Sequence, residues 1–92
     1  MNTIDIKTPS ELAGGIAENL KHLRKSKGLS QKKLAAKAGI SFASLRRFEE
    51  CGEISLKTLL KIAIVLDCAD EFEPIFTTRE IASIQEIIDG KI

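Results

Sequence analysis

The 92-residue chain contains no tryptophan, no tyrosine and four phenylalanines, so leucine, isoleucine, alanine and valine must supply most of its core. Such side chains suit packed helices better than a β-sandwich. Two prolines and six glycines are too few for a loop-rich or disordered protein. No apolar run reaches the roughly 18 residues that a membrane span needs. We therefore expect one all-α domain that does not enter a membrane.

Histidine and cysteine are too scarce for common metal or catalytic sites. Cys51 and Cys68 form no CxxC pair, and His22 is the only histidine. These three residues cannot make an ordinary four-ligand zinc site, and a lone histidine among Lys and Arg is usually a surface residue. The first 20 residues contain no secretory signal pattern. We expect a cytoplasmic protein with free, partly buried thiols, no metal, no cofactor, no catalytic residues and no enzymatic activity.

The net charge of +1 conceals an uneven distribution of charge. Between Asn19 and Phe48 there are nine basic residues and no Asp or Glu, whereas from Glu49 onward ten acids face four bases. A basic block without compensating acids is typical of a phosphate-binding surface. The alternative interpretation is a set of solvated helix faces, which accounts for any single lysine equally well.

Capping residues and apolar spacing divide the chain into helices. Thr8-Pro9-Ser10-Glu11 has the sequence of a capping box, with Thr8 as N-cap. Gly14-Gly15 weakens the following turns, so firm helix is expected only from about Ile16 to Ser26. We expect the apolar segment 56–66 to be the most buried helix. The other expected helical segments are 31–38, 42–50, 70–76 and 77–92.

Two of these helices form a helix-turn-helix pattern, in which a turn of about three residues joins two short helices. Ala35 is small enough for the second helix to cross close by, and Gly39 can adopt the positive φ of a tight turn. Ile40 and Leu45 fill the angle between the helices, and Ser41 caps the second one.

At this spacing the sequence resembles the phage-repressor type of helix-turn-helix regulator, the group of Cro and lambda-repressor-like domains. The resemblance implies five α-helices, here with an added C-terminal helix, and binding of double-stranded DNA, usually as a homodimer, to control transcription. It divides the chain into a loose segment 1–8, a DNA-binding domain 9–76 and an amphipathic helix 77–92 that is a candidate dimerisation element. The motifs that carry it are Leu29-Ser30-Gln31, Leu34-Ala35, Gly39-Ile40-Ser41, Leu45 and Phe48-Glu49.

The resemblance also implies roles for individual residues. Gln31, at a helix N-terminus that suits an anion, matches a phosphate-contacting glutamine. Phe42, Ala43 and Arg47 match positions that face base edges in the major groove. Arg24 and Glu49 match a pair that forms a salt bridge in some family members. The other expected DNA contacts are Lys32, Ser41, Ser44 and Arg46.

Two features depart from the family pattern. Glu50 and Glu53 occupy the stretch where the family often has Asn-Gly and a basic residue that contacts phosphate. Repulsion from phosphate would weaken DNA binding or turn these two side chains away. Phe42 can touch a thymine methyl group but cannot hydrogen-bond to a base, and the alternative for it is packing against the neighbouring turn.

The main expectation is a DNA-binding regulator that represses transcription, and two alternatives to it remain open. The stretches Arg47-Phe48-Glu49, Gly52 to Leu56 and Asp70 to Glu73 also resemble antitoxins that bind kinase-like toxins of the HipA type and repress their own operon. The acids at Glu50 and Glu53 would equally suit a protein-interaction module that has lost DNA binding. A gel-shift experiment with DNA separates the protein-interaction module, which would not bind DNA, from the repressor and the antitoxin, which would.

Overall fold

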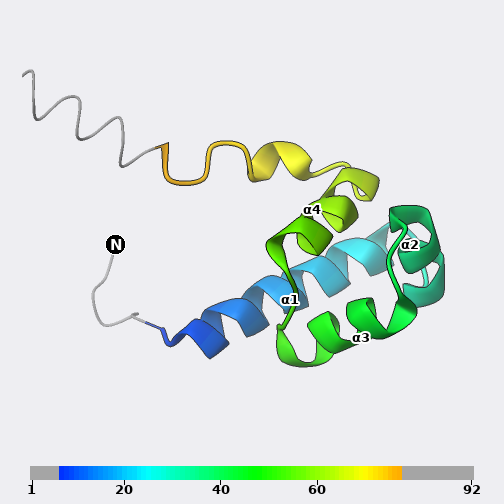
Figure 1. The fold of residues 1–92 in the computed structure, drawn as a ribbon, viewed down its shortest axis with the longest axis horizontal. Coiled ribbons are helices and arrows are strands. Elements are labelled where there is room, and N and C mark those ends of the chain that lie inside the picture. Colours follow the sequence, from blue (N-terminus) through cyan, green and yellow to red (C-terminus); the bar gives the residue numbers. More distant parts are fainter. Residues whose placement is uncertain (1–6, 78–92) are drawn as a thin grey trace, which may run out of the picture.

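The computed structural model describes residues 7–77, and the ordered elements of this part of the chain are helices (Figure 1). They are α1 Pro9–Ser26, α2 Gln31–Ala38, α3 Phe42–Cys51 and α4 Leu56–Val65, followed by a 3-10 turn at Ala69–Glu71. Between residues 7 and 77 there is no β-strand, so the all-α prediction is confirmed for that range. Helix α2 has the predicted bounds, and α3 ends one residue later than predicted.

Helix α1 begins earlier than the firm part expected from the sequence. The Thr8 hydroxyl accepts the Glu11 N–H at 3.1 Å, and the Glu11 carboxylate accepts the Thr8 N–H at 2.9 Å. The hydrogen bond from the Thr8 backbone N–H, and after it the interaction with the Thr8 side chain, lower the pKa of the Glu11 carboxyl group. The capping box holds the first turn, and Gly14 and Gly15 remain helical. The expectation that firm helix begins only near Ile16 was therefore wrong.

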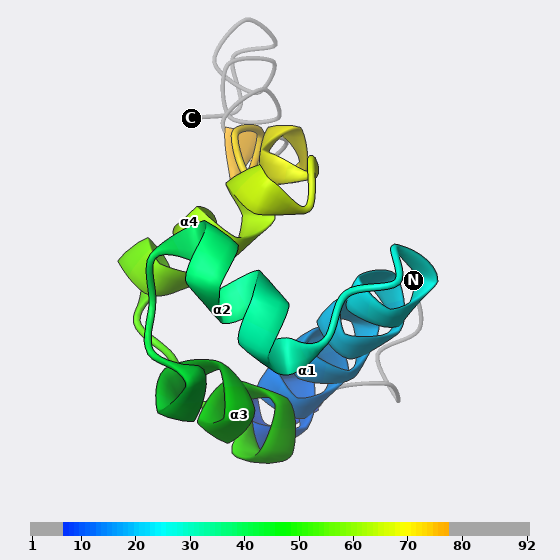
Figure 2. The ribbon, with the colours of Figure 1, turned by 90° about the vertical axis from the view of Figure 1, so that its right-hand side faces the viewer.

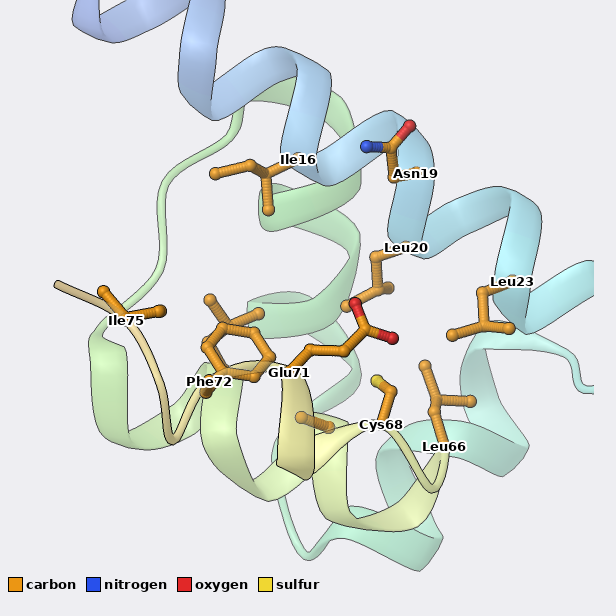
Figure 3. A pocket seen from close by; sticks show the side chains of 11 residues that line it. Ile16, Asn19, Leu20, Leu23, Leu66, Cys68, Glu71, Phe72 and Ile75 are labelled. Atoms are coloured by element: carbon orange, nitrogen blue, oxygen red, sulfur yellow. The ribbon is translucent and has the colours of Figure 1, made fainter. Parts of the chain in front are cut away.

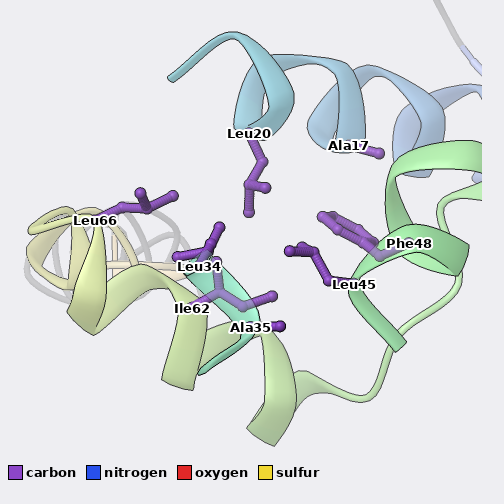
Figure 4. Packing of buried hydrophobic residues seen from close by; sticks show 8 residues of the cluster. All are labelled: Ala17, Leu20, Leu34, Ala35, Leu45, Phe48, Ile62 and Leu66. Atoms are coloured by element: carbon purple, nitrogen blue, oxygen red, sulfur yellow. The ribbon is translucent and has the colours of Figure 1, made fainter. Parts of the chain in front are cut away.

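One apolar core lies where the four helices meet (Figure 4). Its side chains come from the inner faces of all four helices, and Phe48 supplies an aromatic ring from α3. Burial of one such large apolar side chain contributes about 1.5–3 kcal/mol. The buried residues of the cluster are Ala17, Leu20, Leu34, Ala35, Leu45, Phe48, Ile62 and Leu66.

The packing of the helices fixes α3 from one side. Helix α1 packs against α3, and α2 packs against both α3 and α4. In Figure 2, α2 lies in front, with α3 below it and α1 and α4 to either side. Because Leu45 and Phe48 of α3 point into the core, the opposite face of α3 is left exposed.

Helix α4 has one buried face and one exposed face. Ile62 and Ala63 face the core, but Leu56 and Ile64 are 66 % and 68 % exposed. Among the described elements, α4 packs mainly on α2 and on the 3-10 turn, which cover one side of it only. The expectation that 56–66 would be the most buried helix is confirmed among the described helices, because the smallest share of its residues is exposed, although its outer face is not covered.

The segment after α4 does not form the expected fifth α-helix. After the 3-10 turn the chain continues to Thr77 in single turns, such as Ile75 N–H to the Phe72 carbonyl at 3.1 Å. Pro74 has no N–H to donate, and Phe76 has a φ of 74°, so a continuous α-helix cannot form here. The described residues thus contain four α-helices, and the prediction of five is not confirmed.

An apolar groove of about 270 Å³ lies between α1, α4 and this last segment (Figure 3). Ile16 and Leu20 line it from α1, and Phe72 and Ile75 line it from the segment after α4. Cys68 also lines it and is partly buried, which raises the pKa of its thiol. Cys51 is exposed, so the prediction of partly buried thiols was wrong for Cys51.

Residues 1–6 and 78–92 lie outside the described part of the chain. The loose segment predicted for 1–8 and the helix predicted for 77–92 fall largely on these residues, and the predicted division into three segments remains a prediction. No helix within residues 7–77 is long and apolar enough to cross a membrane.

Candidate nucleic-acid interface

The turn between α2 and α3 has the geometry that its sequence predicts. Gly39 ends α2 in the left-handed conformation, with a φ of 68°, and Ser41 caps α3. The Ile40 N–H donates to the Ala35 carbonyl at 3.0 Å and closes the turn. Ala35 is buried between the helices, and Ile40 packs against the core that contains Leu45. Helices α2 and α3 therefore form a helix-turn-helix with a three-residue turn.

The expected base-facing residues lie on the exposed side of α3. Phe42, Ala43, Arg46 and Arg47 are exposed, whereas Ser44 is half-buried. Lys32 at the start of α2 extends toward the same region, and its Nζ atom lies 5.6 Å from the centre of the Phe42 ring. This cation–π contact joins the beginnings of the two helices into one surface. From the sequence, Phe42 could contact a base or pack against the neighbouring turn, and Lys32 was not expected as its neighbour.

The two serines of α3 are engaged in capping the helix. The Ser41 hydroxyl accepts the Ser44 N–H at 3.0 Å and donates to the Ser44 hydroxyl at 2.7 Å. Ser41 is exposed, so its oxygen lies at the surface beside the first turn of α3. A phosphate at this position would meet the serine hydroxyls together with the free N–H groups of a helix N-terminus.

A buried ion pair fixes α3 against α1. The Arg24 Nε atom donates to Glu49 Oε2 at 2.7 Å and its Nη2 atom donates to Glu49 Oε1 at 3.0 Å. The side chains of Arg24 and Glu49 are 7 % and 2 % exposed. Arg24 also donates to the Leu29 carbonyl at 2.7 Å. The two residues that the sequence paired thus lie in bidentate contact, which is the strong form of a carboxylate–guanidinium interaction.

Gln31 belongs to the same network. Its amide nitrogen donates to Glu49 Oε1 at 2.9 Å, so the first residue of α2 is tied to the end of α3. Burial raises the pKa of Glu49, but the hydrogen bonds from Arg24 and Gln31 and the charge of Arg24 outweigh it and lower the pKa. The family resemblance predicted a phosphate contact for Gln31, and this internal partner was not expected. A phosphate contact remains open to its second amide N–H and its backbone N–H.

A family model for helix-turn-helix domains matches residues 20–71, more than half of the chain. The chain belongs to the Cro/lambda-repressor-like helix-turn-helix family. This is a family of DNA-binding transcription regulators and is not typically enzymatic. The match concerns the family as a whole and does not reach the narrower resemblance to antitoxins. A search among curated proteins found no match.

In this helix-turn-helix domain the two acids that depart from the family pattern, Glu50 and Glu53, turn toward the exposed arginines of α3. Arg46 Nε donates to Glu50 Oε1 at 3.0 Å, and Arg47 donates through Nη2 to Glu53 Oε1. From the sequence we expected these acids to repel phosphate or to turn away from it, and the ion pairs were not foreseen. The four-residue spacing of Arg46 and Glu50 on a helix could have revealed the first pair. The second pair crosses the helix end, where spacing gives no signal.

The remaining candidate residues do not assemble into a second polar site. His22 is exposed and lies 3.2 Å from Glu18, one helical turn earlier on α1. Within residues 7–77, no group of three or more His, Cys, Asp or Glu side chains could hold a metal ion. In this part of the chain, the exposed face of α2 and α3 is therefore the surface on which the candidate polar residues come together.

Proposed function

We propose that this regulator binds double-stranded DNA sequence-specifically, with α3 in the major groove, and represses transcription. The observation that supports this best is the exposed face of α3, which carries Phe42, Ala43, Arg46 and Arg47 on a helix held rigidly from behind. An α-helix fits the major groove, where every base pair presents a distinct pattern of donors and acceptors. Occupation of a promoter blocks transcription without any further contact, and for this reason we propose repression.

The contacts divide into two kinds under this proposal. Arg47 and Arg46 read base edges, since a guanidinium can bind guanine in a bidentate manner, and Phe42 and Ala43 pack against thymine methyl groups. Lys32, with the N-terminus of α2 at Gln31, binds phosphate. Ser41 and Ser44 contact the DNA backbone. The phosphate contacts set the register of α3 in the groove, and the base contacts select the sequence.

We propose further that the DNA-binding form is a homodimer. Two half-sites about 34 Å apart give a small domain the specificity that a single helix cannot reach. Apolar side chains that suit a protein contact lie away from the DNA face, on α4 and after it: Leu56, Ile64 and Phe76, the last being 81 % exposed. The predicted amphipathic helix 77–92, with four isoleucines on one side, follows directly and is our candidate dimerisation element.

Fluorescence anisotropy with labelled DNA tests the proposal. A duplex selected from a random library by the protein and an unrelated duplex are titrated between 50 and 200 mM salt. Two to six phosphate contacts predict a loss of affinity of about 10- to 1,000-fold over that range, because each contact releases a counterion. An affinity for DNA that does not change with salt, or no binding to either duplex at 50 mM salt, would refute DNA binding and favour a protein-interaction module.

Deletion of residues 78–92 tests the dimer by light scattering, with circular dichroism as the control for folding. A truncated chain that stays helical and becomes monomeric supports the proposed dimer. A truncated chain that remains dimeric contradicts the role of the C-terminal segment. A truncated chain that unfolds indicates that the segment packs on its own chain.

A further inference from the structure

The exposed arginines of α3 are each paired with an acid of the same chain. Arg46 and Glu50 lie one helical turn apart within α3, with 3.0 Å between Nε and Oε1. Arg47 pairs with Glu53, which follows the end of the helix. All four side chains are at least 60 % exposed, so the pairs lie on the surface that would face DNA.

Fold stability does not explain Glu50. It lies in the last turn of α3, where the negative end of the helix dipole disfavours an acid, and that turn contains no basic residue. Its neighbour Glu49 is explained by the buried pair with Arg24. An exposed ion pair such as Arg46–Glu50 contributes little to stability. The carboxylate of Glu50 therefore has no evident structural role besides its contact with Arg46.

The backbone brings Glu53 to Arg47. Gly52 ends α3 with a φ of 75°, which turns the chain back toward the exposed side of the helix. A Cβ atom at Gly52 would lie 3.0 Å from the backbone carbon of Ala13 in α1, so this turn is packed closely against the domain. Arg47 and Glu53 together line a hollow of about 340 Å³ between the end of α3 and the start of α4. The position of Glu53 is thus set by the fold.

We propose that Glu50 and Glu53 are internal counterions of the DNA-reading surface, which lower the affinity for DNA of arbitrary sequence and thereby raise specificity. This inference rests on the proposed DNA-binding function. The two acids cancel the charge of Arg46 and Arg47, so the positive charge that attracts phosphate remains on α2 and the end of α1. DNA of random sequence must displace a carboxylate to reach either arginine. Because the arginine is already neutralised, this contact releases few ions and adds little to the affinity. A matching base pair compensates the lost ion pair with bidentate hydrogen bonds.

This arrangement makes use of a general property of specificity. A protein discriminates between two DNA sequences by the difference between its binding free energies for them. This difference grows when the wrong sequence meets repulsion. Arginines without internal partners would bind phosphate on any sequence and would tighten specific and non-specific binding together. Glu50 and Glu53 weaken the non-specific complex more, because random DNA offers the arginines no compensating base contact.

The double variant E50Q/E53Q tests the proposal, with E71Q/E73Q as the matched control. Both variants raise the formal net charge from +1 to +3, and both pairs of glutamates are exposed. Glu71 and Glu73 lie in the segment after α4, away from α3 (Figure 2). Binding of each protein to a labelled random-sequence duplex and to the library-selected duplex is measured between 50 and 200 mM salt. Circular dichroism checks that each variant keeps its helices.

For E50Q/E53Q we expect tighter binding to the random duplex and a steeper salt dependence. Two freed arginines steepen the slope of log affinity against log salt by about 1.8, which adds a roughly 12-fold loss between 50 and 200 mM. The ratio of selected to random affinity should fall relative to the wild type. For E71Q/E73Q the slope and the ratio should stay close to those of the wild type.

The other outcomes separate this inference from the proposed function. An unchanged slope in E50Q/E53Q, or an equal change in E71Q/E73Q, overturns the counterion role while DNA binding itself stands. If no protein binds either duplex at 50 mM salt, the proposed function and this inference both fail. If E50Q/E53Q binds DNA and the wild type does not, DNA binding by the natural chain is rejected, and the proposed gain of specificity from the two acids is overturned with it.

Discussion

Replacement of Glu49 by alanine should lower the unfolding free energy by about 3–5 kcal/mol, the range for removal of one partner from a buried ion pair. The size follows from the burial of the pair, in which the Arg24 and Glu49 side chains are 7 % and 2 % exposed. Without Glu49, Arg24 keeps its hydrogen bond to the Leu29 carbonyl but remains a buried charge without a counterion. Gln31 loses the acceptor of its amide nitrogen at the same time.

Thermal and urea unfolding measure this loss, and Glu50→Ala is the matched control. Glu50 is the next residue of the same helix, but its side chain is 63 % exposed, so its removal should change stability by less than about 0.5 kcal/mol. For a domain of this size, Glu49→Ala should lower Tm by at least about 12 °C. The double variant Arg24→Met/Glu49→Leu should lose less than the sum of its single changes, because no charge is left unpaired.

The unfolding free energy should also fall at acidic pH, because the same carboxylate, that of Glu49, becomes protonated. The hydrogen bonds and charge of its partners outweigh burial and hold the pKa of Glu49 below its ordinary value of 4.5 in the folded protein. The unfolded chain therefore takes up the proton first as pH falls. The contribution to stability is complete above about pH 4.5 and is lost below it, through the lower folded pKa. Glu49→Gln should flatten this part of the pH profile. Equal losses for Glu49→Ala and Glu50→Ala, or coupling near zero with Arg24, would refute the reasoning.

Three further changes test other parts of the domain. Arg47→Ala should cost about 1–3 kcal/mol on the selected DNA site and relax preference at one base pair, as measured by selection from a randomised library. Lys33→Ala should weaken binding to all duplexes alike and reduce the slope of log affinity against log salt by about one if this exposed lysine of α2 contacts phosphate. A loss of affinity confined to the selected site would contradict that. Gly52→Ala should lower the unfolding free energy by roughly 2–4 kcal/mol, because strain at positive φ adds to a clash with Ala13. Gly28→Ala, where φ is +69° but no atom lies within 4 Å of the added Cβ, should cost only about half as much; equal losses would refute the close contact.

The helix-turn-helix was predictable because its signals are local. Ser41 and Gly39 act through bonds to residues a few positions away, so their types and spacing already fix the turn between α2 and α3. The capping box of Thr8 and Glu11 was equally readable, but its effect on Gly14 and Gly15 was underestimated. A well-formed first turn makes propagation through glycine favourable even though glycine is a poor helix former.

The features that the sequence did not predict depend on contacts between distant segments. Helix α4 is apolar on nearly all sides, so its sequence does not indicate that Leu56 and Ile64 face outward. That outcome depends on which neighbours cover α4 among the described residues. The partner of Gln31 was missed for a similar reason, since Glu49 lies 18 residues further along the chain and reaches Gln31 only after α2 and α3 have packed.

Glu49 and Glu50 show how adjacent identical residues acquire opposite roles. Consecutive side chains on an α-helix point about 100° apart, so a helix that buries Phe48 turns Glu49 toward α1 and Glu50 toward solvent. The buried carboxylate joins α1, the start of α2 and the end of α3, which fixes the exposed face of α3 relative to α2. Arg46 and Arg47 extend from that fixed face, and under the proposed function each would exchange its neighbouring carboxylate for a contact with DNA. A rigid scaffold with exchangeable partners for its arginines favours DNA that offers the better hydrogen bonds.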